Sequence, residues 1–157
     1  QKERVNLSEL TEMAALEMEL LAEKENIRLE MQIEENLFAE VDESLYLRMV
    51  VNLVSNAIAY HGGPGYVKIR LQGMENQIWG SIEDDGKGIS PEDLPHIWER
   101  FYRVDKARIQ DSHSGLGLPM VKWIVQAHQG EIQVESTLGK GSVFTFWLPT
   151  EESGEKK

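Results

Sequence analysis

The stretch Asn52-Leu53-Val54-Ser55-Asn56-Ala57-Ile58-Ala59-Tyr60 decides the fold of this sequence, together with two later segments. These segments are Asp84-Asp85-Gly86-Lys87-Gly88-Ile89 and Ser114-Gly115-Leu116-Gly117-Leu118. The first supplies amide oxygens for a hard cation, the second a carboxylate at a backbone turn, and the third backbone N–H groups around a phosphate-sized space. One such segment alone is weak support for a site. All three in this order predict a pocket for a nucleotide.

The first segment presents polar side chains at helical spacing. Asn52, Asn56 and Tyr60 stand four residues apart, so a helix places them on one face. An asparagine amide oxygen can ligate Mg²⁺, which takes few protein ligands and completes its shell with phosphate and water oxygens. The alternative is that both amides hydrogen-bond to nearby backbone, and this segment alone favours that alternative.

The second segment follows an expected strand. Gly86 and Gly88 allow a sharp turn and a close approach of the backbone to a ligand. Asp84 can accept a hydrogen bond from an exocyclic amine such as that of adenine. The alternative is a glycine-containing surface turn, because Asp-Gly is a common turn signal. Neither a P-loop nor a G-x-G-x-x-G fingerprint is present.

The third segment opens an expected helix, whose unpaired N–H groups beside glycines favour phosphate; the alternative is a helix-capping loop. Basic residues lie between the second and third segments, where an acidic protein needs cations near a polyphosphate. Arginine is well shaped for phosphate oxygens. Each of these residues alone is better explained as a solvated surface charge. In order of preference, the candidates are Arg103, Arg100, Lys106 and then Arg108.

Composition restricts the class of protein. The chain has 157 residues, 41% of them hydrophobic, which suits one compact domain. The net charge of −11 argues against a nucleic-acid surface and repels anionic ligands from the protein as a whole. No cysteine and no apolar run of about 20 residues occur, so disulfides are excluded and no direct membrane contact is expected. The start without Met and the polar end suggest a piece of a longer protein, with a disordered tail over 151–157.

Periodicity predicts the elements. Apolar residues form one stripe on a helix over about 6–26, capped by Asn6 with Glu9, and this stripe suits either another helix or the domain's own sheet. The stripe comprises Leu7, Leu10, Ala14, Met18 and Leu21. A helix capped at Asp42 or Ser44 should run to about Tyr60. Strands are expected over 27–34, 66–71, 77–83, 131–136 and 142–148, and a further helix has Pro119 at its first position and ends at Gly130.

The sum of these elements is an α+β two-layer sandwich. About five strands form a mixed, mostly antiparallel sheet, and about three helices cover one of its faces. Residues over about 86–114 show no strong period beyond a short helical turn within 91–100. A segment of this length inside a compact domain is typical of a functional lid, and the alternative is a disordered segment.

These segments resemble the boxes of the catalytic and ATP-binding domain of bacterial sensor histidine kinases, which has the Bergerat (GHKL) ATP-binding fold. The residues from Asn52 to Tyr60 resemble its N box, and those from Asp84 to Ile89 its G1 box. Ile97 to Asp105 is similar to its F box, and Ser114 to Leu118 to its G2 box. The similarity extends from about Asn6 to Pro149, and the last strand also resembles the closing strand of the family.

The resemblance implies ATP and Mg²⁺ as ligands and gives each matching residue a role. Asn56 would coordinate Mg²⁺ with Asn52 beside it, and Tyr60 would pack on the adenine. Asp84 would accept the adenine amino group. The other nucleotide contacts that the resemblance implies are Gly86, Gly88, Ile89, Arg100, Arg103, Lys106, Gly115, Leu116, Gly117 and Leu118.

The reaction implied by the resemblance is transfer of the ATP γ-phosphoryl group to a histidine on a separate dimerisation and phosphoacceptor domain, with a response regulator as the further partner. The four histidines of this chain do not cluster and lack the phosphoacceptor setting, so each is expected to be structural or solvent-facing: His61, His96, His113 and His128.

Residues 1–26 are interpreted as the tail of a dimerisation helix or a linker helix, and residues 27–150 as the ATP-binding domain. The location implied is the cytoplasmic part of a membrane-anchored receptor.

Two other function classes remain open. ATP-hydrolysing relatives of the same fold carry a glutamate base where Asn52 stands, and an amide cannot accept a proton from water. A module that senses nucleotide or acts as a scaffold is favoured by two departures from the family pattern. Ala59 replaces the usual lysine and His113 replaces a usual glycine, which implies weakened or altered ATP affinity.

Overall fold

The computed structural model of the protein describes residues 1–100 and 117–150. The predicted tail over 151–157 and the part of the predicted lid after residue 100 lie outside the described residues. The elements run in the order β1 (Glu3–Asn6), α1 (Leu7–Glu17), α2 (Glu19–Lys24), β2 (Ile27–Ile33), β3 (Phe38–Val41), α3 (Glu43–Ala59), β4 (Gly65–Met74), β5 (Gln77–Asp84), the 3-10 helix η1 (Leu94–His96), α4 (Gly117–Ala127), β6 (Glu131–Thr137) and β7 (Gly141–Pro149).

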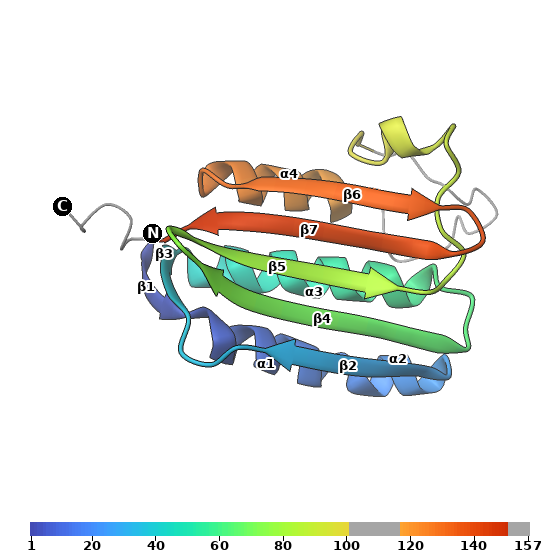
Figure 1. The fold of residues 1–157 in the computed structure, drawn as a ribbon, viewed down its shortest axis with the longest axis horizontal. Helices are drawn as coiled ribbons and strands as arrows, with labels where there is room; N and C mark the ends of the chain where they lie inside the picture. The colour runs from blue at the N-terminus through green and yellow to red at the C-terminus, as the bar shows by residue number, and fades with distance from the viewer. Residues whose placement is uncertain (101–116, 151–157) are drawn as a thin grey trace.

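Five strands form one sheet in the order β2-β4-β5-β7-β6. The β2–β4 pair is parallel and the other pairs are antiparallel, as expected for a mixed sheet. The β4–β5 hairpin closes with Met74 opposite Gln77, and Asn76 adopts a φ of 74° in the turn. The α-helices all lie on one face of the sheet, which confirms the predicted two-layer α+β architecture (Figure 1).

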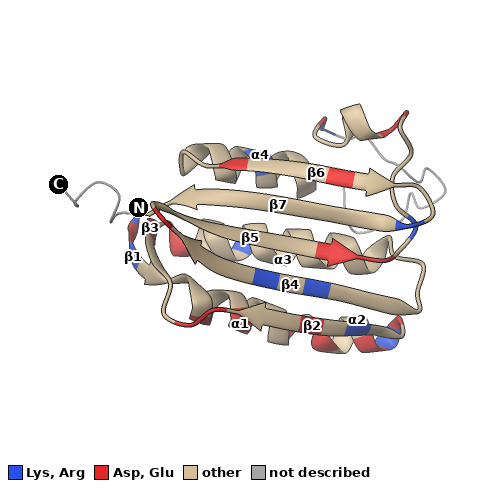
Figure 2. Ribbon diagram, in the orientation of Figure 1, with Lys and Arg blue, Asp and Glu red and all other residues tan. Residues whose placement is uncertain are grey.

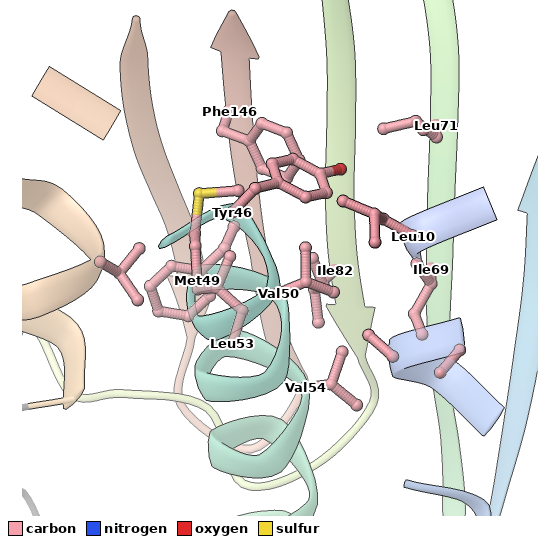
Figure 3. Packing of buried hydrophobic residues seen from close by; sticks show 14 of the residues in the cluster. Leu10, Tyr46, Met49, Val50, Leu53, Val54, Ile69, Leu71, Ile82 and Phe146 are labelled. Carbon is pink, nitrogen blue, oxygen red and sulfur yellow. The ribbon is translucent and has the colours of Figure 1, made fainter. Parts of the chain in front are cut away.

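Helix α3 carries the largest share of the core. Asp42 caps it as predicted, accepting a hydrogen bond from the N–H of Leu45 at 3.1 Å. Its inner face presents Tyr46 and Met49, each 1% exposed. The Tyr46 ring meets Phe146 of β7 edge to face, with ring centroids 6.4 Å apart, and Figure 3 shows the two side chains next to each other in the core. The core therefore holds α3 against the sheet.

The first helix packs on the domain's own core. Asn6 caps α1 as predicted by accepting from the N–H of Glu9 at 3.2 Å. Leu7 and Ala14 of the apolar stripe are fully buried, so this part of the stripe packs against α3 and β2 within the same domain. The predicted single helix is interrupted at Met18, whose ψ of −5° separates α1 from α2. The predicted boundary between residues 1–26 and the rest stays a prediction.

The sequence did not predict the two-stranded ribbon of β1 and β3. Its strands have four residues each and pair antiparallel, with Glu3 opposite Val41. The guanidinium of Arg4 lies over the Phe38 ring, 4.5 Å from its centroid. Four-residue strands are too short to show a clear alternation, which is why the pattern did not reveal them.

The ends of α4 differ from the predicted ones in detail. Pro119 lies two residues inside the helix, at a first-turn position where its missing N–H has no helical partner to lose. The left-handed residue at the other end is Gln129, with φ 59°, and the N–H of Gly130 donates to the carbonyl of Val125 at 2.9 Å. Within residues 1–100 and 117–150, no helix has the length and apolar character needed to cross a membrane.

Residues 86–100, which the sequence assigns to the lid over 86–114, pack against the body of the domain. Ile97 is only 4% exposed. The Trp98 ring meets the Phe144 ring edge to face, with centroids 6.0 Å apart. Through these contacts residues 86–100, the first half of the predicted lid, pack against the sheet.

Candidate nucleotide-binding site

The predicted motifs converge on one end of the molecule. The C-terminal end of α3, the carboxyl end of β5 and the first turn of α4 lie at the same end of the sandwich (Figure 1). Helix α3 packs against both α4 and β5, which holds these three ends in a fixed arrangement. The structure therefore brings the N-box face, the Asp84 turn and the start of the Gly117 helix together.

The two asparagines lie at the margin of the buried face of α3. Asn52 and Asn56 are half-buried, beside Met49 and Leu53, which are each 1% exposed. Over the described residues, neither side-chain amide forms a hydrogen bond. In the described residues the two amides are therefore not hydrogen-bonded to nearby backbone, which was the alternative to a ligand site. Both amide oxygens are available to a ligand. Tyr60, half-buried one turn further on, is the C-cap residue of α3.

The carboxylate of Asp84 lies half-buried at the end of β5. Its Oδ1 accepts a hydrogen bond from the N–H of Gly86 at 2.8 Å. Burial raises the pKa of Asp84 above its usual value, although the Gly86 N–H partly offsets this effect. A carboxylate that is kept in a site at a cost to folding is typical of a functional group.

Each glycine of the Asp84–Ile89 turn packs against protein backbone. A Cβ on Gly86 would lie 2.7 Å from the carbonyl oxygen of His61, and a Cβ on Gly88 would lie 2.1 Å from that of Thr137. Gly88 also has a φ of 73°. These glycines therefore allow the turn to fit tightly between α3 and the β6–β7 turn, and their close approach to a ligand stays a prediction. Gly117 differs, because a Cβ there would meet no atom of the described residues within 4 Å.

The remaining predicted residues fall into two groups. Ile89 and Leu118 are partly buried and pack against the core, and Arg100 is exposed at the end of the described segment. The N–H of Ile89 donates to Ser136 Oγ at 2.8 Å, which attaches this residue to β6. The others lie outside the described residues: Arg103, Lys106, Arg108, His113, Gly115 and Leu116.

The residues present fit a Mg²⁺ ion that arrives with phosphate. Residues 1–100 and 117–150 contain no cluster of three His, Cys, Asp or Glu side chains able to hold a metal ion by themselves. A lone amide oxygen on Asn56 suits Mg²⁺, which binds through few protein ligands and keeps phosphate and water oxygens. Figure 2 shows acidic colour at the carboxyl end of β5, so a polyphosphate at this end needs a cation to offset repulsion.

The sequence did not predict a contact between two residues beside the predicted site, His61 and Asp85. His61 was expected to be structural or solvent-facing, and its side chain is 2% exposed with Nε2 2.7 Å from Oδ1 of Asp85. Asp85 also accepts from the N–H of Tyr66 at 2.8 Å. No sequence signal links the histidine to this carboxylate, because the contact depends on how the helix end meets the β5 turn.

Comparisons with known proteins agree with this arrangement. Residues 41–152 match the family described as "Histidine kinase-, DNA gyrase B-, and HSP90-like ATPase". The chain is 38% identical over 123 residues to the sensor histidine kinase WalK of Bacillus subtilis, covering 76% of this chain and 20% of WalK. It is 37% identical over 146 residues to the sensor-like histidine kinase SenX3 of Mycobacterium tuberculosis, covering 92% of this chain and 36% of SenX3.

Solved structures show the same fold. The nucleotide-free catalytic domain of histidine kinase ThkA superposes with a TM-score of 0.83 at 28% identity, covering 96% of each chain. The mycobacterial sensor histidine kinase MprB superposes with a TM-score of 0.81 at 26% identity, covering 95% of this chain and 97% of that chain. The fold and the site thus define a nucleotide-binding catalytic domain of the histidine kinase type. The chain belongs to the histidine kinase-, DNA gyrase B- and HSP90-like ATPase family, and it spans between 20% and 36% of the two curated relatives described above.

Proposed function

We propose that this chain binds ATP with Mg²⁺ and transfers the γ-phosphoryl group to a histidine on a separate dimerisation and phosphoacceptor domain. Membership of the ATPase family and similarity to named sensor histidine kinases support this proposal. The observation that carries it is the pair of unbonded amides of Asn52 and Asn56 at the same end as the half-buried carboxylate of Asp84.

Each described residue has a distinct role in this proposal. Asn56 holds Mg²⁺ with Asn52 beside it, Tyr60 packs on the adenine, and Asp84 accepts the adenine amino group. Bound Mg²⁺ offsets the charge of the phosphate oxygens. Phosphoryl transfer needs little covalent chemistry from the protein, so these residues act by binding and orienting the nucleotide.

The phosphate end of the site is assigned to the start of α4. Its first-turn N–H groups and the open side of Gly117 suit a phosphate, and Leu118 fixes this turn on the core. Positions outside the described residues are assigned from the family resemblance alone: Arg103, Lys106, Gly115 and Leu116. Gly86, Gly88, Ile89 and Arg100 complete the proposed set.

The same proposal includes partners and a location. A response regulator would receive the phosphoryl group after the phosphoacceptor histidine, and the domain would act on the cytoplasmic side in a membrane-anchored receptor. Hydrolysis of ATP by this chain is disfavoured, because the amide of Asn52 stands where a general base would be required.

Calorimetric titration with Mg·ATP, and labelled phosphate transfer to the phosphoacceptor domain of the same kinase, test the proposal. The native chain should bind and transfer, and Asn56→Ala should lose at least about tenfold in affinity because a metal ligand is removed. Gln72→Ala, an exposed residue of β4, is the matched control and should behave as native. Hydrolysis without transfer would favour an ATPase. No binding heat would favour a scaffold, the function class that the departures from the family pattern at Ala59 and His113 support.

A further inference from the structure

His61 is a buried histidine at the junction of two segments that carry the proposed site. It follows the C-cap residue of α3, and its side chain is 2% exposed. Its Nε2 lies 2.7 Å from Oδ1 of Asp85, the residue directly after Asp84. The pair therefore joins the end of the asparagine-bearing helix to the turn that carries the proposed adenine acceptor.

Further contacts show that this turn packs directly against His61. The N–H of Lys87 donates to the carbonyl oxygen of His61 at 3.2 Å. A Cβ on Gly86 would lie 3.0 Å from the Cγ of the imidazole, so the turn passes directly over the ring. Asp85 Oδ1 also accepts from Tyr66 N–H at 2.8 Å, which attaches the same carboxylate to β4.

The ring is held by one nitrogen only. Among the described residues, Nδ1 of His61 is buried without a hydrogen-bond partner. The arrangement suits the tautomer in which Nε2 carries the proton and donates to the Asp85 carboxylate. The free-energy cost of burying Nδ1 without a partner is comparable to the gain from one charge-assisted hydrogen bond. The histidine therefore contributes orientation of the turn rather than net stability.

We propose that His61 is a positioning residue for the nucleotide site. Through Asp85 it holds the Asp84–Gly88 turn against the end of α3 before a nucleotide arrives, so that the carboxylate of Asp84 keeps its place relative to Asn56. This inference rests on the proposed function. If the turn is correctly placed in only a fraction of the molecules, the apparent affinity for the nucleotide falls in proportion to that fraction.

His61→Gln and His61→Met form a matched pair that tests the hydrogen bond. The two side chains have similar length and volume, but only the glutamine amide can donate to Asp85. Calorimetric titration with Mg·ATP should show an affinity loss of about tenfold for His61→Met, the typical effect of losing a hydrogen bond to a charged group. His61→Gln should retain affinity within about threefold of native.

A second readout needs no nucleotide. In a nitrogen–proton correlation spectrum of the ligand-free chain, the amide signals of Tyr66 and Lys87 should move in His61→Met and stay near their native positions in His61→Gln. Asp85→Asn removes the charged acceptor and should lower affinity in the same direction, which provides a second variant if His61→Met does not fold. His128→Leu is the control for a buried histidine lost elsewhere, and it should lower thermal stability without changing affinity.

The outcomes separate the two proposals. A native chain that does not bind Mg·ATP overturns the proposed function, and the Tyr66 and Lys87 signals then still decide the role of His61. Native binding with unchanged affinity in His61→Met overturns the positioning role. Equal losses in His61→Gln and His61→Met would assign the effect to ring shape and would also overturn it.

Discussion

His128 and Asp42, which are 86 positions apart in the chain, are joined by a hydrogen bond from the Asp42 backbone N–H to Nε2 of the imidazole, at 3.0 Å. The Nδ1 of His128 lies 2.8 Å from the carbonyl oxygen of Ile124, to which it donates. The side chain of Asp42 caps α3, so this histidine ties the C-terminal end of α4 to the N-terminal end of α3. Both nitrogens have defined roles, which places His128 among the structural residues and away from the proposed site.

Replacing His128 by leucine should destabilise the domain. The change leaves the half-buried N–H of Asp42 without its partner, which costs about 1–3 kcal/mol in the free energy of unfolding. Chemical denaturation measures this loss. His96→Leu, at a half-exposed histidine whose partner Glu99 is a surface carboxylate, is the control and should change stability by less than about 0.5 kcal/mol. A loss as small as the control's would show that water satisfies the Asp42 N–H.

Glycines of the two motifs should respond oppositely to alanine. Gly88→Ala places a Cβ 2.1 Å from the Thr137 carbonyl oxygen in a residue with φ 73°, so stability should fall by more than about 2 kcal/mol. Gly117→Ala adds a Cβ that meets no neighbour within 4 Å in residues 1–100 and 117–150, and the residue lies in a helix, so stability should be retained or rise by up to about 1 kcal/mol. Thermal unfolding of both variants checks the contrast. A Gly117→Ala variant as unstable as Gly88→Ala would contradict the open environment of that residue.

The sequence predicts the fold where the pattern is local and long. The apolar face of α3, its Asp42 cap and the alternating strands of the sheet were all expected because each extends over several periods. The β1–β3 ribbon and the break at Met18 were not expected, because short pairings and single backbone dihedral angles leave no periodic signal. The missed contact between His61 and Asp85 has the same origin, since it arises only when two distant segments fold together.

The sequence shows where the motifs lie along the chain, but it does not show which neighbours each motif residue contacts. The sequence placed Asn52, Asn56 and Asp84 in one site, and the structure brings the elements that carry them to one end of the sandwich. The sequence assigned Gly86 and Gly88 to a sharp turn and to close approach of a ligand. The structure shows the turn packed closely against neighbouring backbone, and the contact with a ligand stays a prediction. Spacing identifies which residues are special, but only packing shows which neighbour requires a glycine.

The buried pair of Thr11 and Tyr46 should make the domain sensitive to alkaline pH. Their hydroxyl oxygens lie 2.7 Å apart in the core, and burial raises the pKa of Tyr46 well above its usual 10.0, with a smaller opposite effect from Thr11. The folded state therefore holds the phenol proton more tightly than the unfolded chain, and its stability is lost as pH rises above 10.0. Tyr46→Phe removes this dependence.

Denaturation at rising pH compares the native chain with Tyr46→Phe. The variant should be less stable near neutral pH by about 1 kcal/mol, because Thr11 loses its partner, and it should lose less stability than the native chain above pH 10.0. Thr11→Val in the Tyr46→Phe background is the control and should cost little more, since both partners are then apolar. Parallel curves for native chain and variant would contradict a buried phenol.

Adjacent carboxylates at the end of β5 should act on stability in opposite directions. Burial raises the pKa of Asp84, so the folded state binds a proton more tightly than the unfolded chain and loses stability as pH rises from 3.8 through the raised value. Partial burial also acts to raise the pKa of Asp85, but the hydrogen bonds from Tyr66 N–H and His61 outweigh it and lower that pKa. Asp85 thus contributes stability above 3.8 that is lost as pH falls through the lowered value.

Asp84→Asn should therefore raise the melting temperature at neutral pH, while Asp85→Asn should lower it. The asparagine at position 84 keeps an oxygen for the Gly86 N–H but presents an uncharged acceptor, so affinity for Mg·ATP should fall by at least about tenfold. Thermal unfolding and calorimetric titration on the same two variants measure both effects. If Asp84→Asn gains stability and loses binding, the carboxylate of Asp84 is retained for the ligand and not for folding. A loss of stability in Asp84→Asn at neutral pH would mean that its carboxylate is stabilising, and its retention would then need no nucleotide to explain it.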